Sequence, residues 1–352
     1  MSLRRGITTG ACAAAAAKAA AAVLAGGVAP REVELCLPSG EALRVPILYV
    51  ESQQNPAAAT AAVRKDSGDD PDVTDGLEVR VTLSWDDAAE ATFVAGEGVG
   101  TVTKPGLQIP PGQPAINPVP RQMIVRAIRD VTSRGVRVEI GVPGGRQVAA
   151  KTFNPRLGIA GGLSILGTTG IVRPYCTRAL RDALRCTLDV AAACQVTALV
   201  LVPGNIGARA ARRHFSLREE QLIEVGNEWG FVLNLLPPRA FSALLLLGHP
   251  GKLAKLAADQ WDTHSARSSQ AAAYLGRLCP EVLGHAVPDS TTAEGVFAAL
   301  APPQKKTLAD ELAKRIRTAV MNRLGNRLPV AVYLIDMAGE RLGTDGDYSP
   351  WQ

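Results

Sequence analysis

Two short apolar runs in the second half of the chain restrict its fold most strongly. Residues 197–202 (TALVLV) and 243–248 (ALLLLG) have the length of a strand and no charged residue, which is typical of a strand covered on both faces. Helical patterns at 177–194, 206–214 and 304–323 and further strand patterns at 221–225 and 330–337 surround them. This alternation predicts an α/β domain with a mostly parallel sheet.

The first half of the chain has a different pattern. Residues 11–25 are nearly all alanine, which favours a helix, and the central Lys18 and the lack of a leucine-rich stretch argue against a secretory signal. Segments with alternating apolar and polar residues then predict half-buried strands at 32–37, 42–50, 58–65, 77–83 and 91–95. We therefore expect an N-terminal α+β domain with a mixed or antiparallel sheet.

These patterns suggest where the domains begin and end. We expect an N-terminal domain at 1–172 that carries Gly/Pro-rich substrate segments, and an α/β domain at 173–300. Residues 301–352 are predicted to contribute a helix and a strand that could return to the N-terminal domain, followed by a polar tail after Gly339. The longest aliphatic run is far too short to cross a bilayer, so no membrane association is expected.

Charge and cysteine content narrow the class of ligand. The 352 residues carry a net charge of +5 without a block of Lys and Arg interleaved with aromatic residues, which argues against nucleic acid and suits a small anionic ligand. The six cysteines show neither a C-x-x-C pair nor metal-ligand spacing. They indicate a cytoplasmic protein with reduced thiols and no metal site of its own. A homo-oligomer is compatible with this composition.

Residues 96–120 form a long segment that is dense in glycine and proline. It opens with Gly96, Gly98 and Gly100 after a predicted strand, as a dinucleotide-binding loop does. Such a loop requires a helix next, and Pro105 and Gly106 prevent one. We therefore reject the dinucleotide site, while Lys104 remains available to bind an anion.

Five aspartates crowd the segment KDSGDDPDVTDG at 65–76. Its spacing does not match a calcium-binding loop. Two interpretations stay open: a solvated turn rich in Asx motifs, or a site that tunes a carboxylate such as Asp66 or Asp70 for proton transfer or for stabilising a cation.

Two loops follow the buried strands of the predicted parallel sheet. Ligands of such sheets bind at the carboxyl ends of the strands, so both loops are candidate small-molecule sites. An ordinary βα turn would also favour glycine and asparagine. The candidate residues are Gly204, Asn205 and Gly207 in the first loop, and Gly248, His249 and Gly251 in the second. His249 could carry a proton near neutral pH, whereas residues 262–265 (DTHS) resemble the start of a helix.

Several segments taken together resemble one family. They are GITTGACAAAAAKAA, KDSGDDPDVTDG, GEGVGTVTKPGLQIPPGQPAINPVPRQMI, KTFNPRLGIAGGLSILGTTGIVRPY, LVLVPGNIG, LLLLGHPGKLAKLAA and DTHS. In this order they are similar to the cobalt-precorrin-5B C(1)-methyltransferase family (CbiD) of anaerobic cobalamin biosynthesis. The resemblance runs from about Arg5 to about Ser265, and Cys176 departs from it because a small polar residue is expected there.

The resemblance implies methylation of ring carbon 1 of cobalt-precorrin-5B to give cobalt-precorrin-6A. S-adenosylmethionine would supply the methyl group, and cobalt would arrive only as part of the anionic tetrapyrrole. We expect the two strand-end loops to bind S-adenosylmethionine, with Asp66, Asp70 and His249 as candidate catalytic residues. Acetate and propionate groups on the ring call for cationic and hydrogen-bonding residues. The candidates for binding them are Thr8, Thr9, Gly10, Lys104, Arg121, Arg156, Thr168, Thr169 and Arg173.

Two other functions stay open at this point. One is a carrier that binds a labile tetrapyrrole without changing it. The other is a nucleotide-dependent reductase or ligase built on the α/β domain, although the sequence has neither a phosphate-binding P-loop nor a complete G-x-G-x-x-G motif.

Overall fold

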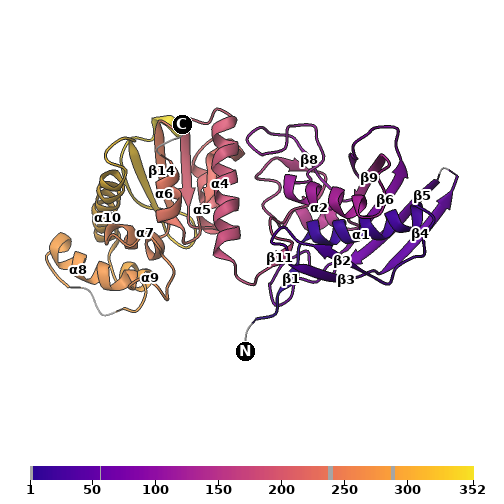
Figure 1. The fold of residues 1–352 in the computed structure, drawn as a ribbon. Coiled ribbons are helices and arrows are strands. Elements are labelled where there is room, and N and C mark those ends of the chain that lie inside the picture. Colours follow the sequence, from indigo (N-terminus) through magenta and orange to yellow (C-terminus); the bar gives the residue numbers. More distant parts are fainter. Residues whose placement is uncertain (1–2, 56, 237–240, 287–289) are drawn as a thin grey trace. The chain divides into compact units, whose positions relative to one another are not determined.

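The structure is a computed structural model that describes residues 3–352 except 56, 237–240 and 287–289, and it contains two compact units (Figure 1). The first unit is Met1–Arg178 and the second is Ala179–Gln352. This division lies close to the boundary expected after residue 172. Residues 301–352 belong to the second unit instead of returning to the first, because their strands extend the sheet of the second unit.

A five-stranded mixed sheet forms the base of the first unit. The strand order is β4-β5-β6-β9-β7, with β7 parallel to β9 and all other neighbours antiparallel. This confirms the expected mixed sheet. The strands are β4 (Tyr49–Gln54), β5 (Ala57–Arg64), β6 (Glu78–Trp85), β7 (Thr92–Ala95) and β9 (Val136–Gly141).

Short ladders join the remaining segments of the first unit. Two of them connect segments that are far apart in the sequence, β1 with β11 and β8 with β10, and the third is the hairpin β2-β3. The strands are β1 (Gly6–Ile7), β2 (Glu32–Cys36), β3 (Ala42–Pro46), β8 (Thr101–Val102), β10 (Ile159–Ala160) and β11 (Ile171–Val172).

Residues 42–50 form two strands and not the single strand that was expected. The chain changes partner at Ile47 and Leu48, where the N–H of Ile47 donates to the carbonyl of Arg31 and that of Leu48 donates to Ala62. β3 therefore pairs with β2 while β4 joins the main sheet. The alternating pattern was correct, but it could not show this change of partner.

The alanine-rich helix α1 (Thr9–Leu24) lies in the core of the first unit and packs on β5, β6 and the helix α2 (Pro118–Arg129). Most of its side chains are fully buried, and their small size allows the neighbouring elements to approach closely. Lys18 is only partly buried, and its ammonium reaches the carbonyl of Glu34 at 2.9 Å and the carboxylate of Asp130 at 2.6 Å. The short helix α3 (Gly145–Ala149) completes this unit.

A second five-stranded sheet forms the centre of the second unit. Its order is β13-β12-β14-β15-β16, and only β16 at the edge is antiparallel, which confirms the mostly parallel sheet. The strands are β12 (Ala198–Val202), β13 (Leu222–Glu224), β14 (Ala243–Gly248), β15 (Val330–Ile335) and β16 (Arg341–Asp345). The helices are α4 (Thr177–Ala193), α5 (Asn205–His214), α6 (Trp229–Leu235), α7 (Pro250–Ala257), α8 (Ala271–Leu283), α9 (Ala293–Ala298) and α10 (Pro302–Arg323), with 3₁₀ turns at Glu219–Gln221 and Ser349–Trp351.

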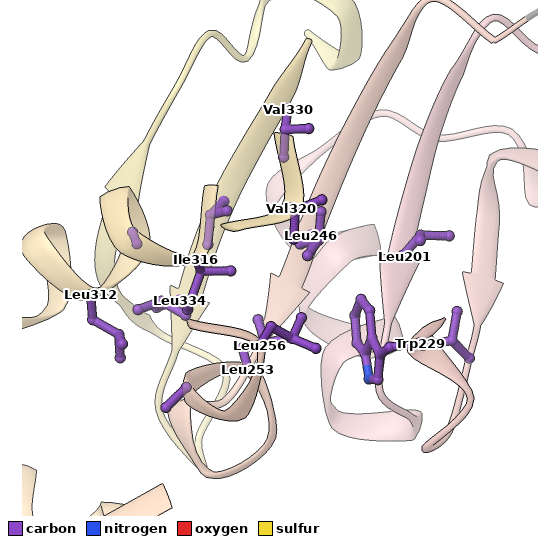
Figure 2. Close-up of a cluster of buried hydrophobic side chains, with 14 of the residues drawn as sticks. Leu201, Trp229, Leu246, Leu253, Leu256, Leu312, Ile316, Val320, Val330 and Leu334 are labelled. Atoms are coloured by element: carbon purple, nitrogen blue, oxygen red, sulfur yellow. The ribbon is translucent and has the colours of Figure 1, made fainter. Parts of the chain in front are cut away.

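Both faces of this sheet are covered, as continuous apolar strands require. Leu201 and Leu246 point to the face that packs against Trp229, α7 and α10 (Figure 2). Val200 and Leu245 point to the other face, where α5 covers them. The helices α5 and α6 therefore lie on opposite faces of the sheet.

The polar tail after Gly339 was not expected to contain a strand. It forms β16, which pairs with β15 and packs against α10. Gly343 makes this close approach possible, because a Cβ atom at this position would lie 2.5 Å from the backbone carbon of Ala309. The alternation of large apolar residues on which strand prediction depends is absent from this short edge strand.

One prediction concerns a buried charge in the first unit. The side chain of Lys65 is 2% exposed, and its ammonium lies 2.8 Å from Asp72 Oδ2 and 2.5 Å from Ser67 Oγ. We expect Asp72→Asn to lower the free energy of unfolding by about 2–4 kcal/mol, because it leaves a buried cation without its counter-ion. Urea unfolding at pH 7 measures this, and adding Lys65→Met should recover part of the loss.

The same ion pair predicts a pH dependence. Burial opposes ionisation of Asp72, yet hydrogen bonds from Lys65 and the N–H of Thr74 lower the pKa of this carboxyl below its ordinary value. The ionised carboxylate therefore stabilises the fold above about pH 4, and the stabilisation is lost as the pH falls through the lower folded pKa. The difference in stability between the natural protein and Asp72→Asn should shrink over that window. A constant difference down to pH 2 would contradict this prediction.

A third prediction tests the contact between β16 and α10. Gly343→Ala should reduce the free energy of unfolding of the second unit by about 1–3 kcal/mol, because the strand and the helix must separate. Gly276→Ala is the matched control, since Gly276 lies within α8 with open space around its Cα. It should instead stabilise the unit by about 0.5–1 kcal/mol. Urea unfolding followed by tryptophan fluorescence distinguishes the two, and equal effects of both changes would refute the assigned contact.

Candidate functional site

The N-terminal end of α1 is fixed by Thr8. Its backbone is extended, and its hydroxyl accepts the N–H of Ala11 at 3.2 Å as the N-cap of the helix. The neighbouring Thr9 hydroxyl accepts the N–H of Leu166 at 2.9 Å, and the N–H of Gly10 donates to the carbonyl of Leu166. The predicted binding residues Thr8, Thr9 and Gly10 are therefore tied to a segment some 160 residues away.

The two Thr-Thr-Gly sequences of the chain meet here. β1 pairs with β11, and the N–H of Thr8 donates to the carbonyl of Gly170 at 3.0 Å. Gly167 has a φ of +126°, and a Cβ at this position would lie 2.3 Å from Thr8 Oγ1, so only glycine fits. Thr8 and Thr9 are buried, whereas Thr168 and Thr169 are exposed beside them. Of the four threonines, this second pair is the one open to a ligand.

The aspartate-rich turn lies against the same strand. The N–H of Ile7 donates to the carbonyl of Asp66 at 2.7 Å, and Gly6 leaves no room for a Cβ beside Ser67. Asp66 pairs with the guanidinium of Arg4, and this hydrogen bond lowers the pKa of the Asp66 carboxyl. The backbone N–H of Arg4 also donates to Asp69 at 2.6 Å. The turn thus holds residues 4–7 in place.

Asp70 has a different partner. Its Oδ1 atom accepts the backbone N–H of Tyr175 at 2.9 Å. Tyr175 has a φ of +54°, which is unusual for an aromatic residue, and its side chain is 73% exposed. Each of the five aspartates of the turn accepts a hydrogen bond, as Asx-type turns do; their donors are Arg4, Gly68, Tyr175, Lys65, Thr74 and Ser67. A role in proton transfer for Asp66 or Asp70 stays a prediction.

The predicted cationic residues occupy different places. Arg121 Nε donates to the carbonyl of Ile116 at 2.9 Å, and burial lowers the pKa of this guanidinium. The stem of Lys104 packs on Gly158, where a Cβ would lie 2.4 Å from Lys104 Cγ. The guanidinium of Arg156 lies 5.6 Å from the ring of Phe153. Arg173 is exposed directly after β11, so among these four it is the residue beside the paired Thr-Thr-Gly sequences.

Both Gly/Pro-rich segments take part in this arrangement. The N–H of Gly100 donates to the carbonyl of Leu163 at 2.8 Å, β8 pairs with β10, and Ile116 bridges to Ile165. The N-terminal end of α2 follows, with Pro120 so close that a Cβ at Gly10 would lie 2.8 Å from its Cγ. The structure therefore brings together the segments at 4–10, 66–70, 114–121 and 164–175, which overlap the four segments of this unit that carry the family resemblance.

In the second unit the two predicted loops lie at the same edge of the sheet. β12 and β14 are parallel neighbours, so the loops that follow them are adjacent. The chain passes from β12 through α5 to β13 on one side, and returns through α6 to β14 on the other side of β12. The strand order reverses between β12 and β14, and such a switch point is where sheets of this kind bind ligands.

The glycines of these loops differ in their surroundings. Gly248 allows close packing, since a Cβ there would lie 2.7 Å from Pro203 Cδ, and a Cβ at Gly207 would lie 3.1 Å from the carbonyl of Leu247. A Cβ at Gly204 would meet no atom within 4 Å. Gly204 and Asn205, at the start of α5, are therefore the part of the first loop with open space beside it.

His249 is held by both ring nitrogens. Its Nδ1 atom accepts the N–H of Gly251 at 3.0 Å as the N-cap of α7, and its Nε2 atom lies 2.9 Å from Glu294 Oε2. Since Nδ1 is an acceptor, the neutral ring carries its proton on Nε2 and donates it to Glu294. This arrangement orients the imidazole, and its proposed role in carrying a proton stays a prediction.

A polar network at this edge was not found from the sequence. Lys252 Nζ lies 2.6 Å from Asn227 Oδ1, and the N–H of Thr263 donates to the carbonyl of Asn227 at 3.2 Å. Residues 262–265 are thus a turn packed against the segment after β13, and not the helix start that was expected, since α8 begins at Ala271. The sequence does carry one signal for this network. The segment KLAK at 252–255 follows a strand end and places Lys252 and Lys255 on one face of a helix.

Two further properties concern the part of the chain that the structure describes. Within it, no group of three or more His, Cys, Asp or Glu side chains is arranged to hold a metal ion. No helix in that part combines the length and the hydropathy that crossing a bilayer requires.

Comparison with known proteins gives matches in both units. The family model CbiD matches residues 1–174, and the model for the CbiD C-terminal domain matches residues 262–346. A solved structure of a cobalamin biosynthesis protein (cbiD) from Archaeoglobus fulgidus is 30% identical, with 75% of this chain and 83% of that chain covered and a TM-score of 0.40.

Similar proteins cover nearly the whole length of the chain. A cobalt-precorrin-5B C(1)-methyltransferase of Syntrophotalea carbinolica is 52% identical, with 99% of both chains covered. Proteins with the same name from Salinispora arenicola and Alkaliphilus metalliredigens are 42% and 40% identical, and cover 97% and 95% of this chain and 92% and 90% of their own. The chain therefore belongs to the CbiD family.

Proposed function

We propose that this protein is a methyltransferase that converts cobalt-precorrin-5B to cobalt-precorrin-6A by methylating ring carbon 1, with S-adenosylmethionine as the methyl donor. The observation that carries the proposal is the 52% identity, over 99% of both chains, to a protein named cobalt-precorrin-5B C(1)-methyltransferase. Neither a carrier nor a nucleotide-dependent reductase is favoured by the names of the relatives. Cobalt belongs to the substrate in this reaction.

The reaction sets simple demands on the protein. Transfer of a methyl group from a sulfonium is an in-line displacement, so the main task is to align the donor sulfur, the methyl carbon and the ring carbon. The bond from carbon to sulfur breaks as the bond from the methyl group to ring carbon 1 forms, and the sulfur leaves as a neutral thioether. The π-system of the macrocycle makes the ring carbon nucleophilic, so a strong base is not needed for this step.

The carboxyl edge of the parallel sheet is the proposed place of the methyl donor. The loops after β12 and β14 meet at the switch point of the strand order, and Gly204 has open space beside it. Backbone N–H groups at the start of α5 lie at this edge and suit the polar groups of a nucleoside. Gly204, Asn205, Gly207, Gly248 and Gly251 are the residues we assign to the donor.

The paired Thr-Thr-Gly sequences are the proposed place of the tetrapyrrole. Thr168, Thr169 and Arg173 are exposed there and offer hydroxyl and guanidinium groups to the carboxylates of the ring. Thr8, Thr9 and Gly10 are buried under them and hold the segment in position. Lys104 and Arg121 contact the Gly/Pro-rich segments, and we assign them to supporting these segments. They also supply positive charge near the substrate.

The first test of this function is a measurement of mass. Purified protein incubated anaerobically with S-adenosylmethionine and cobalt-precorrin-5B should give a tetrapyrrole that is heavier by one methyl group. Omitting the protein or the donor should abolish the gain, and donor labelled in its methyl group should pass the label to the product. Intact substrate after incubation with folded protein would refute the proposed activity.

A second test asks what the carboxylate of Asp70 does. If Asp70 positions Tyr175, Asp70→Asn should keep most of the activity because the amide oxygen still accepts the Tyr175 N–H, and Asp70→Ala should lose about tenfold or more through misplacement. If the carboxylate accepts a proton, both variants should be equally impaired. Turnover of the two folded variants at pH 7 distinguishes the roles. Asp69→Asn, which keeps an oxygen for the N–H of Arg4, is the control for removing a charge from the same turn.

A further inference from the structure

Two lysines of α7 lie one helical turn apart and turn their ammonium groups to the same carbonyl. Lys252 Nζ lies 3.4 Å and Lys255 Nζ lies 3.1 Å from the carbonyl oxygen of Thr263. Lys252 is part-exposed, while Lys255 is only 6% exposed. A buried lysine is uncommon, because removing an ammonium from water is costly unless the charge is compensated.

The other partners of both lysines are neutral. Lys252 donates to Asn227 Oδ1 at 2.6 Å, and Lys255 donates to Ser268 Oγ at 2.7 Å. Neither ammonium forms an ion pair with any residue that the structure describes. The nearby carboxylate of Asp262 is occupied, because it accepts hydrogen bonds from Arg267 at 2.8 Å and from the N–H of His264 at 3.0 Å.

This arrangement leaves positive charge in excess. Burial lowers the pKa of both lysines, and the charge of Lys255 lowers that of Lys252 further, whereas Asp262 opposes these shifts. A contact that only fastened residues 262–268 to α7 would need one lysine, and Lys255 already makes it. The second lysine, Lys252, is part-exposed, and its charge repels that of Lys255. Its presence therefore points to a bound anion.

The position of the network agrees with a ligand site. Asn227 follows β13 and Lys252 follows β14, and β12 lies between these two strands. The hydrogen bond from Lys252 to Asn227 therefore joins the loops on either side of the carboxyl end of β12, where the strand order reverses. Thr263 belongs to the same polar network, because its hydroxyl lies 3.2 Å from Asn227 Oδ1.

We propose that the polar network of Asn227, Lys252, Lys255 and Thr263 binds a carboxylate. Lys252 is the residue that contacts it. Lys255 is a positioning residue that fixes Thr263 and raises the local positive potential. An ammonium has three N–H donors, and Lys252 uses one in the short bond to Asn227 and one in the longer bond to Thr263. The inference rests on the proposed function for the identity of the carboxylate. Two sources share this chemistry: the amino-acid end of S-adenosylmethionine and an acetate or propionate group of the tetrapyrrole.

The test compares ligands with and without a carboxylate, using the full-length protein. The change Lys252→Gln should weaken binding of S-adenosylhomocysteine about tenfold or more, because a charged hydrogen bond is lost. Binding of 5′-methylthioadenosine, which lacks the amino-acid end, should stay the same. Titration calorimetry gives both dissociation constants. Lys314→Gln, at an exposed site on α10, is the matched control for the loss of one lysine.

The source of the carboxylate is settled by a third probe, uroporphyrin, a stable tetrapyrrole with carboxylate side chains. If Lys252→Gln weakens binding of uroporphyrin and leaves S-adenosylhomocysteine unchanged, the site takes a carboxylate of the macrocycle. If all three ligands bind the folded variant as they bind the natural protein, or all weaken equally, the carboxylate site is refuted. Methyl transfer by the natural protein is measured separately, so the proposed activity can stand while this inference fails.

The role of Lys255 has its own readout. Lys255→Met should lower the melting temperature by removing the bonds to Thr263 and Ser268, and S-adenosylhomocysteine should bind more weakly in the folded fraction. Ser268→Ala removes one of these bonds without changing the charge and should leave the affinity nearly unchanged. Equal losses of affinity in Lys255→Met and Ser268→Ala would contradict an electrostatic contribution from Lys255.

Discussion

The close packing around the alanine helix α1 is the constraint on which the first unit depends. Alanine side chains leave the backbone of the helix within reach of β5, β6 and α2, so the N-terminal end of α1 comes to lie against the segments at 66–70 and 164–175. Larger residues would force these elements apart. The only charged side chain within the helix, Lys18, extends to Asp130 and so does not disturb the core. The proposed tetrapyrrole site is thus built on the end of a rigid helix.

The two proposed sites place functional groups in the same manner. In each, glycines allow two loops to approach closely, and polar side chains then fasten loops that are far apart in the sequence. Thr9 joins Leu166 in the first unit, and Lys252 joins Asn227 in the second. Contacts of this kind hold backbone segments in one arrangement, which suits a reaction that depends on alignment more than on acid–base chemistry.

Much of the fold could be predicted from local patterns, while the sites depended on contacts between distant residues. The buried strands β12 and β14 and the helix α1 follow directly from their composition. The change of partner at Ile47 and the edge strand β16 have no local signal, because both depend on which strand lies beside them. The Thr-Thr-Gly sequence that occurs at 8–10 and again at 168–170 is too short to predict that the two copies lie together. The pairing of β1 with β11 nevertheless places them side by side. Lys255 resembles a solvated lysine in KLAKLA, and only the position of residues 262–268 shows that it is buried.

The order of strands in the second sheet affects how the protein is made. β14 lies between β12 and β15, but β15 follows only after α7, α8, α9 and α10. As the chain leaves the ribosome, the strand ALLLLG therefore pairs on one side and exposes an apolar edge on the other until Ile335 has been added. Unpaired apolar edges promote aggregation, so this interval is when a nascent chain would need a chaperone most. A fragment that ends before Val330 keeps that edge permanently and should be insoluble even though most of its helices are present.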